Sequence, residues 1–216
     1  MLPSNPVWRD HTTTRGLPQA WNYTLNWLII FLVVVVVIGP ILYLLPNARD
    51  NRLIALREQA RQAGMAVQIT SVPKLDPPAY ERVSAGAKLL EPKRLCTAYK
   101  LPVGTKLSAV DRLLLLKKPE LPTILVNEVM PGWVLYGEAG EAFWRTYAGD
   151  AVAAQQLQDT LSRLPEDALG VSIDEEFVSC YWLEKAAADS DGVTDIAKIL
   201  TALRDDLVDR FAVIIC

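Results

Sequence analysis

The stretch Trp27–Leu45, WLIIFLVVVVVIGPILYLL, separates a short N-terminal segment from most of the chain. None of its residues is charged or strongly polar, and five consecutive valines, Val33–Val37, occupy its middle. As a helix rising about 1.5 Å per residue it would be about 28 Å long, which matches the roughly 30 Å hydrocarbon core of a bilayer. A surface helix of a water-soluble protein keeps one polar face, and this stretch has none. The sequence therefore predicts a single transmembrane helix over residues 21–46.

Aromatic residues gather at both ends of this predicted helix. Trp21, Tyr23 and Trp27 lie at its start, and Tyr43 lies near its end. Tryptophan and tyrosine are enriched where membrane proteins pass from lipid to water, so we interpret these four residues as membrane-interface anchors. The Gly39-Pro40 pair predicts a bend, which is either a contact for another helix or a tolerated kink that faces lipid.

Basic residues on the two sides of the apolar stretch predict its orientation. Two arginines precede the stretch and four follow it closely: Arg9 and Arg15 before it, and Arg49, Arg52, Arg57 and Arg61 after it. Because flanking basic residues stay in the cytoplasm, we expect a bacterial-type inner (plasma) membrane protein with its N-terminus outside and its C-terminal domain in the cytoplasm. We interpret Arg49, Arg52 and Arg61 as candidate lipid-facing residues, and Arg57 as part of the ordinary surface of a packed helix.

Charge is distributed unevenly after the apolar stretch. Residues 47–118 hold 14 Lys/Arg against 6 Asp/Glu and residues 119–216 hold 6 against 18, although the whole chain carries only −3. A basic half next to the membrane would be attracted to anionic lipids, and the acidic half would then be free to meet a basic partner. Alternatively, the two halves fold together and neutralise each other. We expect no nucleic-acid binding, because the basic excess is spread thinly and the distal half is acidic.

Hydrophobic periodicity predicts an α+β soluble domain over residues 47–216, after a disordered N-terminal tail over residues 1–20. The predicted helices are 47–63, 150–164 and 193–211, and the predicted strands are 65–72, 94–101, 123–129, 133–136, 171–173 and 177–183. Asp191 or Thr194 is expected to cap the last helix. Residues 113–116 fit either a strand or a short helix. Short connections favour antiparallel pairing, so we expect a mostly antiparallel sheet covered by amphipathic helices.

The sequence lacks the motifs of the common chemistries. Its only histidine, His11, precedes the apolar stretch, so the main domain cannot form a histidine-dependent triad. It contains no C-x-x-C, no H-E-x-x-H and neither of the common glycine-rich nucleotide cradles. The aspartates around Gly192 lack the glutamate that a calcium loop requires, so we interpret them as turn and cap residues. We therefore expect no cofactor and no metal, and the sequence nominates no catalytic residue.

Three features allow two interpretations each. Trp133, Trp144 and Trp182 fit either core aromatics or a platform for a ligand. The acidic run 174–176 fits a solvated hairpin turn, or an acid–base pair if burial separates the pKa values of its carboxylates. Cys180 lies among apolar residues with no base near it in sequence, which favours a packed thiol over a nucleophile.

The leading hypothesis is a non-enzymatic accessory, assembly or scaffold subunit that contacts the lipid bilayer and one or more membrane-protein partners. It rests on the single predicted span, the missing catalytic motifs and the uneven charge. In layout the chain resembles bitopic accessory subunits of bacterial membrane machines, although no motif carries that likeness. The alternative is a membrane-tethered domain that binds or transforms a small ligand with carboxylates and tryptophans. A third interpretation is a lipid sensor that uses the basic half.

Overall fold

The computed structural model divides the chain into two compact units, Met1–Asn47 and Ala48–Cys216. It describes residues 20–43, 48–105, 107, 112–122, 124–185 and 190–211. The predicted tail therefore lies outside the described residues except for Ala20. The first unit holds one helix, α1 (Ala20–Tyr43), whose side chains are described from Asn26 to Gly39 and are all exposed. Over the described part of the chain, none of the helices combines the length and the apolar character needed to cross a membrane.

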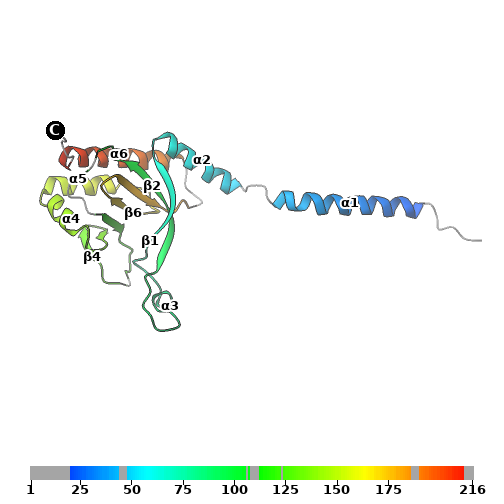
Figure 1. Ribbon diagram of the computed structural model, residues 1–216, viewed down its shortest axis with the longest axis horizontal. Coiled ribbons are helices and arrows are strands. Elements are labelled where there is room, and N and C mark those ends of the chain that lie inside the picture. The colour runs from blue at the N-terminus through cyan, green and yellow to red at the C-terminus, as the bar shows by residue number, and fades with distance from the viewer. Residues whose placement is uncertain are drawn as a thin grey trace, which may run out of the picture. The chain divides into compact units, whose positions relative to one another are not determined.

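The second unit is built on one antiparallel sheet, which confirms the predicted α+β class. Seven strands are described, in the spatial order β1-β2-β7-β6-β3-β5-β4 (Figure 1). Their bounds in chain order are β1 (Ala66–Pro73), β2 (Lys93–Pro102), β3 (Leu113–Lys117), β4 (Asn127–Met130), β5 (Trp133–Leu135), β6 (Ala168–Ile173) and β7 (Phe177–Trp182). Every neighbouring pair is antiparallel. Because β1 and β4 stand at the two ends of this order, they form the edges of the described sheet.

Helices cover one face of this sheet, and hydrophobic periodicity predicted three of these four. They are α2 (Ala48–Gln62), α4 (Glu141–Ala148), α5 (Ala151–Leu161) and α6 (Ser190–Phe211). α5 and α6 run side by side across the sheet (Figure 1). Asp50 lies in the first turn of α2, where its charge suits the positive end of the helix dipole. α2 ends before Gly64, whose φ of 79° is a conformation that glycine adopts without strain.

The main core lies between the sheet and these helices. The largest fully buried side chains there include Tyr99, Leu115, Ile173 and Trp182 from the strands. α6 contributes Ile196, Leu200, Leu203 and Leu207, the stripe that its sequence period predicts. A smaller apolar cluster lies on the opposite face of the sheet, around Cys96, Ala98, Leu116, Val134 and Tyr181. The sheet is therefore packed on both faces, although the helices cover only one.

The basic and acidic halves of the sequence do not form separate bodies. The basic half supplies β1, β2 and β3, and the acidic half supplies β4 to β7. Strands β7 and β6 from the acidic half lie between β2 and β3 from the basic half. Of the two arrangements considered from charge alone, the observed topology corresponds to halves that fold together.

Several predicted boundaries need correction. Residues 113–116 form a strand, β3, because both their faces are buried in the centre of the sheet. The segment 141–148 is a helix, α4, that the short apolar spacing between two glycines did not reveal. The prediction that Asp191 or Thr194 caps the last helix is wrong, because α6 already begins at Ser190. The strand predicted over 123–129 is shorter, since β4 begins only at Asn127.

A projecting arm, residues 74–92, joins β1 to β2 (Figure 1). It contains one short helix, α3 (Ala79–Arg82), and a single bridge between Val83 and Leu89. Two ion pairs hold its base, Lys74 with Glu81 at 2.6 Å and Arg94 with Asp76 at 3.1 Å. The sequence predicted a plain loop here, because the prolines at 77 and 78 interrupt any regular pattern.

Candidate functional site

A buried polar cluster joins α2 to the sheet. It consists of Arg57 from α2, Thr97 and Tyr99 from β2, and Glu184, which follows β7. The guanidinium of Arg57 donates to both carboxylate oxygens of Glu184, with Nη2 to Oε2 at 2.6 Å and Nε to Oε1 at 3.2 Å. The Tyr99 hydroxyl donates to Glu184 Oε1 at 2.6 Å. Arg57 Nη2 also lies 3.5 Å from Thr97 Oγ1. We call these four residues the junction cluster.

Local structure explains how the four side chains converge. On α2, Arg57 lies four residues after Leu53 and three before Ala60, and both of these pack against the main core. Thr97 and Tyr99 are two residues apart on β2, so both side chains lie on the helix-covered face of the sheet. Glu184 stands two residues beyond the end of β7 with a φ of 49°, a left-handed conformation that costs a residue other than glycine about 1–2 kcal/mol. The cluster therefore holds Glu184 in a backbone conformation that it would otherwise avoid.

Electrostatics favour the charged form of the pair. Burial alone would raise the pKa of Glu184, which is 5% exposed, but the hydrogen bonds from Arg57, Tyr99 and Thr97 outweigh burial, and the pKa is lowered. The hydrogen bond to Glu184 raises the pKa of Arg57 despite partial burial. Burial first, and then the nearby carboxylate, raise the pKa of Tyr99. The cluster is thus a carboxylate, a guanidinium and a neutral phenol at ordinary pH.

This arrangement suits a mechanical role. Both oxygens of Glu184 already accept hydrogen bonds, and no buried side-chain nitrogen or oxygen among the described residues lacks a partner. A general base must face a substrate, and Glu184 is only 5% exposed and is held within the cluster by Arg57 and Tyr99. Removing one member of a buried ion pair typically costs about 3–5 kcal/mol, because the other charge stays behind without its partner. The junction cluster therefore fixes α2, the helix that follows α1 in sequence, to the centre of the sheet.

Sequence reasoning did not find this cluster. It placed Arg57 on the surface of a packed helix, whereas the side chain is only 28% exposed and ion-paired. Glu184, Tyr99 and Thr97 were not singled out at all. Arg57 and Glu184 are 127 residues apart in sequence, and no local spacing connects them. The one available signal was a charged residue, Glu184, directly after a strand rich in apolar residues.

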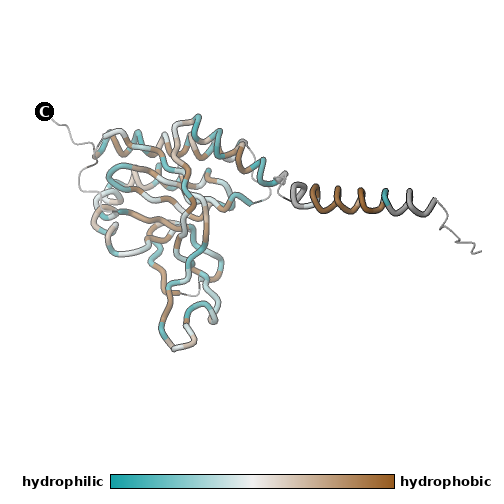
Figure 2. Tube along the Cα trace, turned by 45° about the vertical axis from the view of Figure 1, so that its right-hand side comes forward, coloured by the Kyte–Doolittle hydropathy of each residue, from teal (hydrophilic) through white to brown (hydrophobic). Residues whose placement is uncertain are grey.

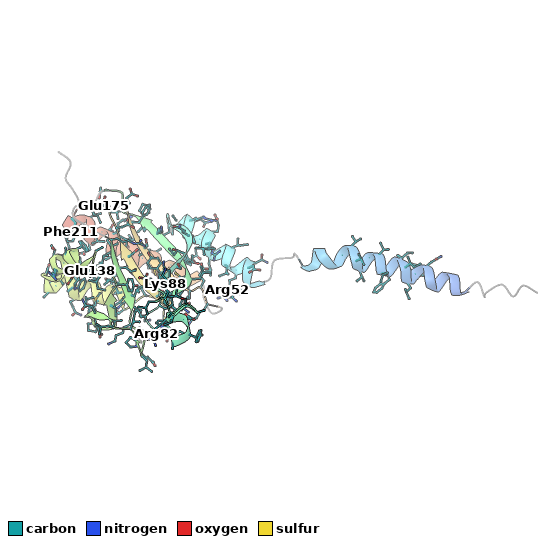
Figure 3. The ribbon with its side chains drawn as sticks, turned by 60° about the horizontal axis from the view of Figure 1, so that its bottom comes forward. Arg52, Arg82, Lys88, Glu138, Glu175 and Phe211 are labelled. Carbon is teal, nitrogen blue, oxygen red and sulfur yellow. The ribbon has the colours of Figure 1, made fainter. Side chains whose placement is uncertain are left out.

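The predicted membrane-facing residues stay exposed where they are described. Arg49, Arg52 and Arg61 are all on the exposed surface of α2, and Arg61 lies 3.5 Å from Glu58. Figure 3 labels Arg52 on this helix. Trp27 is 71% exposed on α1. The side chains of Trp21, Tyr23 and Tyr43 lie outside the described part of α1.

The three ambiguous features adopt their simpler interpretations. Trp133, Trp144 and Trp182 are at most 8% exposed and belong to the main core, so none of them is a surface platform for a ligand. Residues 174–176 form the β6–β7 turn, in which Asp174 Oδ1 accepts hydrogen bonds from the main-chain N–H groups of Glu176 and Phe177. Cys180 is fully buried, and burial raises the pKa of its thiol. Burial also raises the pKa of Cys96, to about 11, so neither thiol is an activated nucleophile.

A second polar cluster ties the helices to one another. Tyr147 of α4 donates to Asp206 of α6 at 2.7 Å, and Arg210 binds both Asp206 at 2.7 Å and Asp150 at 2.9 Å. Asp150 also caps α5, as predicted, by accepting from the N–H groups of Val152 and Ala153. An open cleft of about 300 Å³ lies beside it, between α5 and α6, and is lined by Leu157, Thr160, Arg163 and Ala202 among others. The charged groups of this cluster pair with one another, which again suits a structural role.

The arm carries two of the most exposed large apolar side chains of the described domain. Tyr80 and Leu89 are each 80% exposed, and Leu90 is 46% exposed. Figure 3 labels Arg82 and Lys88, which place basic groups on the same arm. Exposed apolar side chains that gather in one segment, rather than standing singly, can mark a surface that contacts a partner.

Metal binding and known relatives give no further assignment. In the portion of the chain that the structure describes, no group of three or more His, Cys, Asp or Glu side chains is placed to hold a metal ion. Comparisons of this chain with protein-family models, with curated proteins and with solved structures found no match.

Proposed function

We propose that this protein is a non-enzymatic, single-pass inner-membrane protein that acts as an accessory, assembly or scaffold subunit through its cytoplasmic domain. In this proposal, residues 21–46 anchor the chain in the bilayer and the domain 47–216 presents surfaces to membrane-protein partners. The junction cluster then has a clear use, because it fastens the segment next to the anchor firmly to the folded domain.

The exposed surface of α1 carries this proposal. Every side chain from Trp27 to Ile38 is large and apolar, and each is 43–71% exposed. Figure 2 shows most of this stretch of α1 in the brown of hydrophobic residues. Leaving apolar surface in water costs about 25 cal/mol per Å², and soluble monomers rarely expose contiguous apolar patches of more than a few hundred Å². A bilayer would remove this cost without any protein partner, and the uncharged stretch Trp27–Leu45 is the segment that we propose to cross it.

Fractionation of cells that express the full chain tests the anchor. We expect the wild-type protein in membranes washed with alkaline carbonate, and a Val34→Arg/Val35→Arg variant in the soluble fraction, because two central arginines oppose insertion. The control is Leu121→Arg/Leu125→Arg, which changes two apolar residues that are 81% and 103% exposed in the second unit. Wild-type protein in the soluble fraction, or equal retention of both variants, would contradict the proposal.

Cysteine labelling tests the orientation. In a Cys216→Ser background, we expect a membrane-impermeant maleimide to label Ser4→Cys but not Leu125→Cys in intact cells. Opening the cells should make Leu125→Cys reactive. The native Cys96 and Cys180 are buried, so they contribute little background. The reverse pattern in intact cells would mean that the domain faces outward.

Purification in mild detergent at native expression tests the accessory role. We expect a membrane protein to co-purify in a fixed ratio, and the Tyr80→Ala/Leu89→Ala variant of the arm to lower that ratio. A matched change at Leu121 and Leu125 to alanine controls for the loss of exposed apolar surface. Elution of the protein without any other polypeptide would contradict the accessory role.

A further inference from the structure

We propose that β1 is an interface between two copies of this chain. In this arrangement β1 of one copy pairs antiparallel with β1 of the other, and the two sheets continue into each other across a two-fold axis. The inference concerns a surface and a partner that the accessory role does not specify, and it does not depend on the membrane anchor.

The first observation is that β1 is long and regular for an edge strand. It pairs with β2 over eight consecutive residues, from Ala66 opposite Lys100 to Pro73 opposite Lys93, without a register shift. No described strand lies beyond it in the sheet. An edge strand presents a row of main-chain donors and acceptors, and a long edge with an unbroken register is the form that can accept another strand.

The second observation is that β1 has no charge. Its sequence, AVQITSVP, contains no Lys, Arg, Asp or Glu, although charged residues are what proteins commonly place on edges to prevent pairing. In antiparallel pairing about a two-fold axis at Ile69, Ile69 faces its own copy, and Gln68 and Thr70 lie diagonal to theirs, so a charge at any of these positions would lie close to an identical charge. A partner with a different sequence imposes no such condition. The neutrality of the residues around Ile69 therefore favours a second copy of this chain.

The third observation is an apolar patch where this pairing would bury it. Ile69 in the middle of β1 is 60% exposed, and Leu95 on β2 is 71% exposed. Ile69 is opposite Thr97, so Leu95 is its diagonal neighbour on the same face of the sheet. Pairing centred on Ile69 would set the two copies of Ile69 against each other. β-branched side chains that meet across neighbouring strands stabilise the pairing.

The test compares charge variants of Ile69 in the full chain, purified in mild detergent. Light scattering coupled to size exclusion measures association over a dilution series. We expect the wild type to form dimers. The dissociation constant of the dimer should rise about tenfold or more in Ile69→Lys and in Ile69→Glu, since like charges would meet at the axis. Mixing the two variants in equal amounts should restore the dimer, because Lys then faces Glu.

Matched controls separate this surface from others. Leu125→Lys places the same charge on a fully exposed residue outside β1 and should dimerise as wild type does. Far-ultraviolet circular dichroism should show that all variants stay folded, because Ile69 is exposed rather than part of the core. Hydrogen exchange should be slower over residues 66–73 in the wild-type dimer than in monomeric Ile69→Lys.

Three outcomes would overturn the proposal: a wild-type monomer at all concentrations, a dimer that Ile69→Lys leaves unchanged, or no recovery on mixing the Lys and Glu variants. The second outcome would assign dimerisation to another region, such as α1. None of these outcomes bears on membrane fractionation, so this proposal and the accessory role can fail separately.

Discussion

β1 and β4 form the two edges of the same sheet, and they differ in length, regularity and charge. β1 has eight residues in an unbroken register with β2 and no charged side chain. β4 has four residues, and its register with β5 shifts between Glu128 and Met130. Glu128 on β4 accepts a hydrogen bond from Lys118 and another from the N–H of Gly132.

The comparison shows which edge resists pairing. Short strands, bulges and charges are the devices that keep edges from joining other strands, and β4 has all three. β1 has none of these three, and the one proline it contains, Pro73, lies at its end. A sheet that needed protection at both ends would protect both, so the difference marks β1 as the edge that is available for contact.

The two sides of the sheet also differ in their ion pairs. On the β1 side, Arg57 and Glu184 are 28% and 5% exposed and reach the centre of the domain. On the β4 side, Lys118 and Glu128 are 33% and 37% exposed. A buried pair is costly to break, whereas an exposed pair contributes little because water and salt screen it. Substitutions in the two pairs therefore measure the difference directly.

The largest effect is expected for Glu184→Gln. The substitution removes the carboxylate from the half-buried Arg57 and from Tyr99, so we expect the free energy of unfolding to fall by about 3 kcal/mol. Urea unfolding of the full chain in detergent, followed by tryptophan fluorescence, measures the loss, since Trp133, Trp144 and Trp182 are all buried. A loss no larger than that of an exposed pair would mean that the junction cluster does not hold α2.

The effect of Glu184→Gln on the free energy of unfolding should depend on pH. Because the folded state lowers the pKa of Glu184 below its ordinary 4.5, the stabilisation is fully present above that pH. It is lost as pH falls from 4.5 through the folded-state pKa. The difference in unfolding free energy between wild type and Glu184→Gln should therefore shrink progressively below pH 4.5. A difference that stays constant from pH 7 to pH 3 would contradict the assignment of the shift to Glu184.

An intermediate effect is expected at the glycines that shape the chain beside each edge. Gly64 precedes β1 with a φ of 79°, and Gly132 turns β4 into β5 with a φ of 77°. Alanine at either position should cost about 1 kcal/mol, because a Cβ atom disfavours positive φ even where space is open. Gly86→Ala in the arm is the control, since its φ is not positive and the added Cβ would meet only Ser84 Oγ at 3.9 Å. Equal stability of all three variants would rule out strain as the cause.

The smallest effect is expected for Glu128→Gln. The pair with Lys118 is open to solvent, so the unfolding free energy should not change beyond experimental error in the urea assay used for Glu184→Gln. The substitution does remove a charge from the β4 edge. A clear loss of stability would show that this exposed pair is more important to the fold than its burial indicates.

Secondary structure followed well from sequence wherever one face of an element is buried. Ile196, Leu200, Leu203 and Leu207 predicted α6, and the Pro131-Gly132 pair predicted the β4–β5 turn. α4 was missed because it is short, and its apolar residues Phe143, Trp144 and Tyr147 lie in one packed turn of helix. The junction cluster was missed because its members come from segments that meet only after the sheet has formed.

By itself, the sequence determined the α+β class, the antiparallel sheet and the helices that cover it, because periodicity depends on which face of an element is buried. It also supplied the uncharged stretch on which the predicted anchor rests. Only the tertiary structure decided that the basic and acidic halves share one sheet, that Arg57 meets Glu184, and that β1 and β4 are the edges of the described sheet. Strand order and long-range pairing arise from how whole elements pack together, and no local spacing of residues records that packing.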